Sequence, residues 1–237
     1  MKHIDEFVDD RQKAWCIHCG NGLAGLVTNR DHVPSKCLLD KPYPAALPVT
    51  EVCRDCNNGF SRDEEYLVAF LGAVLAGSTD PVLQTIPRSA NILRRNHKLR
   101  ERIARAQTTF TTRGGETRML WKPEQERVDN VLLKNARGHA LFEYGEPMLE
   151  PPDRIWSAGL ETLGPAERAT FENATDGALW PEVGSQMLTR VVTGHDLQDG
   201  WVIVQDGVYR YAVLQDGLMT VRIVIREYLA AEVTWDG

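Results

Sequence analysis

Four of the five cysteines fall in two Cys-x-x-Cys pairs, and this pattern predicts a structural zinc site. Each pair places two thiolates on one tight turn, and two such turns supply the tetrahedral sulfur set that zinc prefers. The expected ligands are Cys16, Cys19, Cys53 and Cys56. We expect His18 to be a bystander inside the first pair and Cys37 to be a small buried residue. A four-thiolate site has no position for water, so any catalytic residues must lie elsewhere.

The 33 residues between the two pairs carry side chains suited to phosphodiester hydrolysis. Residues 28–34 have the sequence Thr-Asn-Arg-Asp-His-Val-Pro, and Asn57 follows the second pair directly. Asp31 offers a hard oxygen ligand for Mg²⁺, and His32, with an ordinary pKa of about 6.5, can act as a general base. Neighbouring residues on a strand point to opposite sides, so Asp31 and His32 need a twist or bulge to converge on one phosphate.

The order Cys-x-x-Cys, Asp-His-x-x-Pro, Cys-x-x-Cys-Asn resembles the zinc-containing branch of the HNH endonucleases, over residues 16–65. The resemblance implies a ββα-metal site, a β-hairpin and a helix folded around a divalent metal. It implies a catalytic set of Asp31, His32 and Asn57, with Mg²⁺ or Mn²⁺ held by Asp31 and Asn57. For Asn57 it leaves two roles open: carbonyl ligand to that metal, or clamp on the loop that carries His32. Asn58 takes this part if the register differs by one residue.

The chain departs from the plain HNH pattern because no third histidine follows Asn57. Some relatives are similar in using an Asp-His-Asn set without that histidine. Asp63 is a possible auxiliary metal ligand, and the alternative is that it only favours the positive end of a helix dipole.

The chain is expected to be α+β, with an N-terminal ββα-metal zinc module, a mixed helical region and a C-terminal antiparallel β meander. Ser61 and Glu64 match a capping box, which predicts a helix from Arg62 to about Ala76. The turn-rich segment 77–81 then predicts a boundary between a zinc module, 1–77, and an accessory region, 78–237. Further expected elements are a hairpin of Thr108–Thr112 and Thr117–Trp121, a helix from Pro123 to Tyr144, and strands Trp201–Gln205, Val208–Gln215 and Met219–Arg226 separated by Asp-Gly turns.

The net charge of −6 excludes a uniformly basic nucleic-acid binder, so a contact with nucleic acid needs a local basic surface. The segment Arg88–Arg105 has seven basic side chains and one acidic side chain, with apolar residues at helical spacing. It predicts an amphipathic basic helix that holds the DNA backbone through Arg94, Arg95, Lys98 and Arg102. The alternative is a solvated helix face paired with acids elsewhere.

The expected function is a metal-dependent endonuclease that cuts DNA. Two alternatives stay open: a zinc module that binds nucleic acid or protein without cutting, and an effector that cuts RNA. Hydrophobic content of 43% and charged content of 25% are typical of a folded soluble protein. Without a signal segment or an apolar run of about 20 residues, we expect a cytoplasmic protein with no membrane partner. An exposed edge of the meander suits a homodimer, and the resemblance points to bacterial defence or mobile elements.

Overall fold

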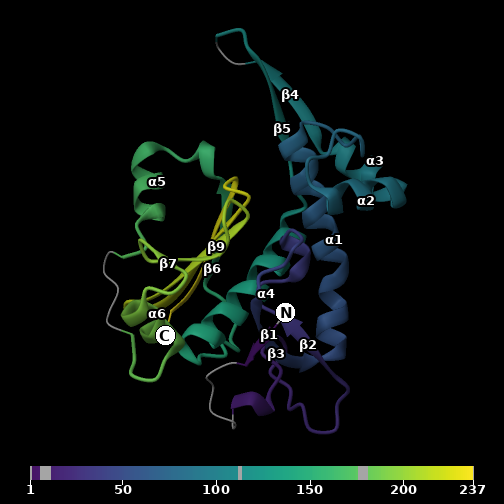
Figure 1. Ribbon diagram of the computed structural model, residues 1–237. Coiled ribbons are helices and arrows are strands. Elements are labelled where there is room, and N and C mark those ends of the chain that lie inside the picture. The colour runs from purple at the N-terminus through teal and green to yellow at the C-terminus, as the bar shows by residue number, and fades with distance from the viewer. Residues whose placement is uncertain (1, 6–11, 112–113, 176–180, 237) are drawn as a thin grey trace. The chain divides into compact units, whose positions relative to one another are not determined.

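The computed structural model describes residues 2–5, 12–111, 114–175 and 181–236, and it has the expected α+β class. The chain forms two compact units, one of residues 1–59 and 132–237 and one of residues 60–131 (Figure 1). The expected boundary at Gly77 coincides with the end of a helix at Ala76. Whether 1–77 is a domain in its own right stays a prediction.

The first unit begins with a three-stranded sheet of order β1-β3-β2. Its strands are β1 (Lys2–Asp5), β2 (Thr28–His32) and β3 (Ala46–Cys53). β2 pairs antiparallel with β3, and β3 runs without a break into helix α1 (Arg54–Ala76). Short 3-10 helices lie at Gln12–Ala14 and Lys36–Leu38. The strands β2 and β3 with the start of α1 therefore form the ββα element that the sequence predicts.

The predicted start of α1 is wrong, although its predicted end at Ala76 is confirmed. The helix begins at Arg54, and Ser61 lies inside it instead of capping it. The second cysteine pair replaces the serine cap, because the backbone N–H of Cys56 donates to Sγ of Cys53 at 3.5 Å. A sulfur acceptor thus satisfies one of the first N–H groups of the helix, which otherwise have no intrahelical partner.

The C-terminal part of the first unit is a six-stranded antiparallel sheet of order β6-β11-β10-β9-β8-β7. Its strands are β6 (Arg154–Gly159), β7 (Leu197–Gln198), β8 (Trp201–Gln205), β9 (Tyr209–Gln215), β10 (Leu218–Ile225) and β11 (Leu229–Asp236). The meander expected from the Asp-Gly turns is confirmed, and the structure adds β6, β7 and β11. At the turn before β8, Asp199 and Gly200 both have positive φ, as tight hairpin turns require.

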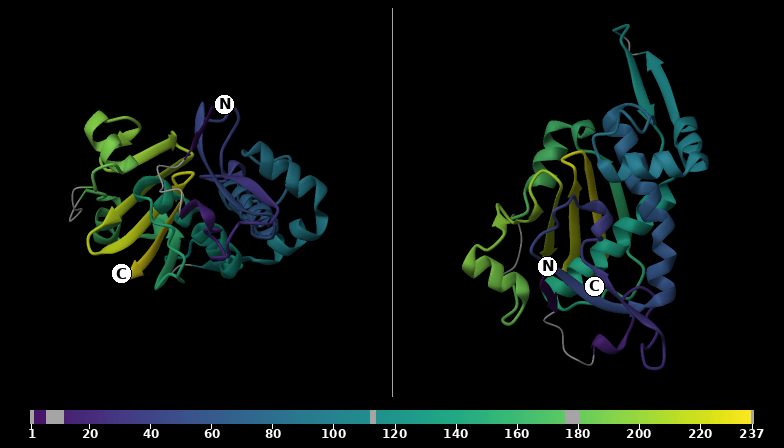
Figure 2. Two further views of the ribbon diagram at one scale, coloured as in Figure 1. Left: turned by 90° about the horizontal axis from the view of Figure 1, so that it is seen from below. Right: turned by 45° about the vertical axis from the view of Figure 1, so that its right-hand side comes forward.

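Helices cover both faces of this sheet (Figure 1 and Figure 2). Side chains alternate along β9, so that Tyr209 and Tyr211 meet His139 of helix α4 (Gln125–Tyr144). Ala212 and Leu214 face the other way and pack with Phe171 of helix α5 (Pro165–Glu172). The 3-10 helix Leu160–Thr162 and helix α6 (Gln186–Thr193) complete the unit. The second half of α4 thus lies between the sheet and the N-terminal ββα element.

The second unit holds α2 (Pro87–Arg95), α3 (His97–Arg105) and a hairpin of β4 (Gln107–Thr111) and β5 (Thr117–Trp121). The hairpin is confirmed, with Thr112 outside the described residues. The prediction of a single basic helix is wrong, because the helix is interrupted at Asn96 and the segment forms two helices. Asn96 has non-helical backbone angles, and its side-chain oxygen accepts the N–H of Leu99 at 3.1 Å, which starts a new helix.

Within the described residues, no helix is long and apolar enough to cross a bilayer.

Close packing of α4 on the ββα element depends on Gly138. A Cβ atom at Gly138 would lie 2.6 Å from a methyl group of Val33, which is 5% exposed and follows His32. Val33 has little freedom to move aside, because β-branched side chains are stiff and its N–H also bonds the Pro48 carbonyl.

We expect Gly138→Ala to lower the free energy of unfolding by ~1–3 kcal/mol, the usual range for overpacking. Urea unfolding followed by circular dichroism measures this. Gly59→Ala is the matched control, since a Cβ there meets nothing within 4 Å and a helical alanine is favourable by up to ~1 kcal/mol. Equal stability of wild type and Gly138→Ala would contradict the packing described.

Candidate metal centre and the residues around it

The two cysteine pairs converge on one point in the structure. The four Sγ atoms, of Cys16, Cys19, Cys53 and Cys56, all lie within 4.8 Å of one another. The first pair occupies a loop closed by Cys16 N–H donating to the Asn21 carbonyl at 2.8 Å. The second pair spans the junction between β3 and α1. This cluster can hold a metal ion such as zinc, and its donor set of four sulfurs fits that ion.

The sulfur cluster favours a cation on electrostatic grounds. Burial, and after it the neighbouring sulfurs of Cys53 and Cys16, raise the pKa of the Cys56 thiol well above its ordinary value. Four thiolates this close repel one another unless a cation neutralises them, and metal binding reverses the shift because it displaces the protons. The guanidinium of Arg137 supplies a positive charge near the sulfurs. Burial lowers the pKa of Arg137, and the negative charge of Cys16, Cys56 and Cys19 partly offsets that lowering.

Asp31 lies in the middle of the ββα element and is 6% exposed. Its Oδ1 atom forms an ion pair with Nζ of Lys134 at 2.9 Å, and its Oδ2 atom lies 3.4 Å from Nε2 of His18. Burial raises the pKa of Asp31, but the hydrogen bond from His18 and the charge of Lys134 outweigh it, and the pKa falls below its ordinary value. The carboxylate is therefore ionised, and both of its oxygens already have protein partners.

His32 is the last residue of β2 and is half-buried, with its Nε2 atom inside the protein. The ladder between β2 and β3 pairs Asp31 with Thr50 and His32 with Val49 without a register shift. Side chains of successive residues in a regular strand point to opposite faces. The ladder therefore has no bulge at Asp31 or His32, and the joint action of the two residues on a phosphate stays a prediction.

Asn57 lies in the first turn of α1, directly after Cys56, and is half-buried, whereas Asn58 is exposed. Asp63 lies further along the same helix, in the second unit, and both of its oxygens are engaged. Oδ1 is 3.1 Å from Nη1 of Arg127, and Oδ2 accepts from Nδ2 of Asn130 at 3.0 Å. Because α1 starts at Arg54, Asp63 does not lie in the first helical turn, where it was expected to complement the dipole. The metal-binding roles of Asn57 and Asp63 stay predictions.

The predicted DNA-backbone residues lie on α2 and α3 and differ in how they are used within the second unit. Arg102 forms a two-pronged ion pair with Glu124 and lies over the ring of Tyr66 at 5.9 Å. Arg94 donates to Oδ1 of Asn91 at 3.0 Å, and its side chain, like those of Arg95 and Lys98, is exposed. Arg102 therefore has a structural role already, while the other three present charge to solvent.

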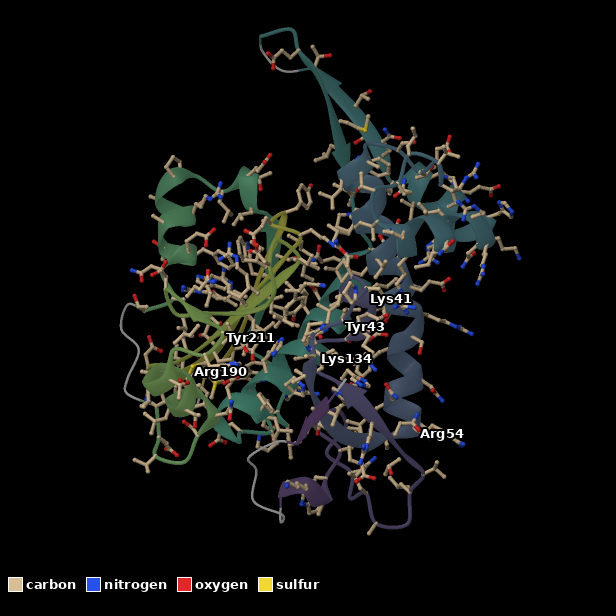
Figure 3. The ribbon with its side chains drawn as sticks, viewed as in Figure 1. Lys41, Tyr43, Arg54, Lys134, Arg190 and Tyr211 are labelled. Atoms are coloured by element: carbon tan, nitrogen blue, oxygen red, sulfur yellow. The ribbon has the colours of Figure 1, made fainter. Side chains whose placement is uncertain are left out.

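Polar residues of α4 that the sequence motifs do not include contact this part of the chain, and Lys134 among them is labelled in Figure 3. Lys134 bonds Asp31 and also donates to Oγ of Ser35 at 2.9 Å. Asn135 accepts the N–H of Ser35 at 2.9 Å, and Arg137 donates to the carbonyl of His18 at 2.8 Å. A signal was present: α4 places charged and polar residues within an otherwise apolar helical stretch, and buried polar groups need partners.

Comparison with known proteins gives no match: no protein-family model, curated protein or solved structure is significantly similar to the chain. The likeness to HNH endonucleases therefore depends on the residues and their spacing alone.

We expect the purified protein to contain about one zinc ion per chain, bound by the four sulfurs. Cys56→Ser should lose most of that zinc and unfold at a lower temperature, because metal binding contributes to folding free energy. Cys37→Ser is the control: Cys37 is buried outside the cluster, so zinc content should not change. Inductively coupled plasma mass spectrometry gives the stoichiometry, and equal zinc content in wild type and Cys56→Ser would contradict the assignment.

Proposed function

We propose that the chain is a nuclease of the HNH type that hydrolyses phosphodiester bonds in DNA. The observation that carries the proposal is the ββα element, in which β2 ends at His32 and the four sulfurs gather at the junction of β3 and α1. The motif order along residues 16–57 supports it independently. In this proposal a zinc ion bound by the four cysteines is structural and stabilises the ββα element.

His32 is the general base in this proposal. It takes a proton from a water molecule whose oxygen forms a bond to phosphorus, while the bond from phosphorus to the leaving sugar oxygen breaks and that oxygen receives a proton from solvent. Nε2 is buried, so Nδ1 is the nitrogen that would accept the proton. A neutral imidazole suits this task near pH 7, and its placement at the end of a paired strand restricts its orientation.

Mg²⁺ or Mn²⁺ at Asp31 and Asn57 comes from the resemblance alone. Asp31 does not fit that part as it stands, because Lys134 and His18 already engage its two oxygens. We therefore derive no step of the reaction through such an ion. Positive charge for the phosphate backbone comes in this proposal from the exposed side chains of Arg94, Arg95 and Lys98.

The engaged carboxylate of Asp31 favours a second candidate, a zinc module that binds nucleic acid without cutting it. Both candidates use the zinc scaffold and the basic helices, and they differ only in whether His32 does chemistry. An RNA-cutting effector would use the same base, so the assay below includes both nucleic acids.

We expect purified protein to nick plasmid DNA, and His32→Ala to lower the rate by ~10²–10⁴-fold, the usual contribution of a general base. Gel assays with plasmid DNA, branched DNA and RNA, each with and without Mg²⁺ or Mn²⁺, measure the rate and the substrate class. His195→Ala, prepared in parallel, is the matched control because the side chain of His195 is 76% exposed. Equal nicking by wild type and His32→Ala would contradict the role of His32 as general base. Binding of nucleic acid without nicking would favour the second candidate.

We expect the triple substitution of Arg94, Arg95 and Lys98 by alanine to weaken DNA binding and reduce the slope of log affinity against log salt by ~2–3. Each phosphate contact contributes about 0.9 to that slope. Fluorescence anisotropy at several salt concentrations measures it. Arg102→Ala should change the slope little and lower thermal stability, since Arg102 pairs with Glu124. The assignment fails if the triple variant keeps the wild-type slope.

A further inference from the structure

Lys134 is a buried ammonium group in the first unit, and its placement decides what the site can bind. The residue lies in α4 and is 4% exposed. A charge taken out of water is tolerated only where it is paired and hydrogen-bonded. Nζ of Lys134 meets this condition with two oxygen atoms, Oδ1 of Asp31 and Oγ of Ser35, each at 2.9 Å.

The two oxygens that hold this ammonium are also suitable ligands for a hard divalent cation. Carboxylate oxygens are donors that Mg²⁺ and Mn²⁺ favour, and a serine hydroxyl can add a neutral oxygen ligand. Asn135 fixes Ser35 from the other side, because its side-chain oxygen accepts the Ser35 N–H at 2.9 Å. Asp31 and Ser35 therefore form a preorganised oxygen pair, and the atom that sits between them is a nitrogen of the protein itself.

A divalent ion and the ammonium cannot share this place. An ion bound to Oδ1 of Asp31 would lie within a few ångströms of Nζ, and like charges at that distance repel strongly where water is excluded. The other oxygen of Asp31 faces His18, and the backbone of His18 is held by Arg137 at 2.8 Å. The carboxylate thus has no second side that turns toward solvent.

We propose that Lys134 is a built-in cation that closes a latent divalent-metal site formed by Asp31 and Ser35. The wild-type chain takes up no Mg²⁺ or Mn²⁺ at Asp31, and the site opens to such an ion only when the ammonium is removed. The proposal concerns metal binding and holds whether or not the chain cuts nucleic acid.

Titration of the zinc-loaded, full-length protein with Mn²⁺, followed by electron paramagnetic resonance of the free ion, tests the wild-type chain. We expect Asp31→Asn to leave Mn²⁺ uptake unchanged, because Asp31 does not bind the ion. Mn²⁺ binding to wild type that disappears in Asp31→Asn would overturn the proposal. This comparison needs no variant of Lys134.

Variants of Lys134 test whether the closed site opens. Lys134→Ala removes the charge and leaves room for a hydrated ion, and we expect it to bind Mn²⁺ at least ~10-fold more tightly than wild type and to regain thermal stability when Mn²⁺ is added. Lys134→Met removes the charge but fills the space, so Mn²⁺ should restore less stability. The double variant Asp31→Asn with Lys134→Ala should lose the response. A folded Lys134→Ala variant without added Mn²⁺ affinity would overturn the proposal.

Discussion

The ion pair between Lys134 and Asp31 is the contact on which the arrangement of the ββα element against α4 depends. Neither charge is exposed to water, and a buried charge that loses its partner destabilises a protein by several kcal/mol. The pair therefore restricts the packing of β2 on α4 to one register, because a shift of either element would separate the two charges. Ser35 and Asn135 reinforce that register through the loop that follows His32.

The same helix connects this element to the C-terminal sheet by a second set of buried polar contacts. Glu143 is fully buried and accepts from Nε of Arg190 at 3.0 Å and from the hydroxyl of Tyr211. His139 bonds the hydroxyl of Tyr209 at 2.9 Å and stacks on the ring of Tyr211. Such networks specify one alignment of the packed layers, since a partly satisfied network is costly. Helix α4 thus packs against both the ββα element and the C-terminal sheet of the first unit.

The structure gives the two neighbouring residues Asp31 and His32 different surroundings, a difference that the motif alone does not show. Within the Asp-His pair, the carboxylate of Asp31 is buried and serves as an internal counter-ion, whereas His32 at the end of β2 is half-buried. The sulfur cluster lies at the far end of the same hairpin and holds the start of α1. A proposed nuclease reaction on this scaffold therefore relies on His32 and on charge supplied from outside the Asp31 pocket.

The sequence by itself determined the features that depend on close neighbours, because turn chemistry and helical periodicity act over a few residues. These features are the two cysteine pairs, the Asp-Gly hairpins and the C-terminal ends of α1 and α4. It misplaced the start of α1 and missed the break at Asn96, where competing local capping signals were present. Only the tertiary structure decided that Lys134 meets Asp31 and Ser35, the latter 99 positions away. Periodicity shows which face of a helix is buried, but the partner of a buried charge depends on how distant elements pack.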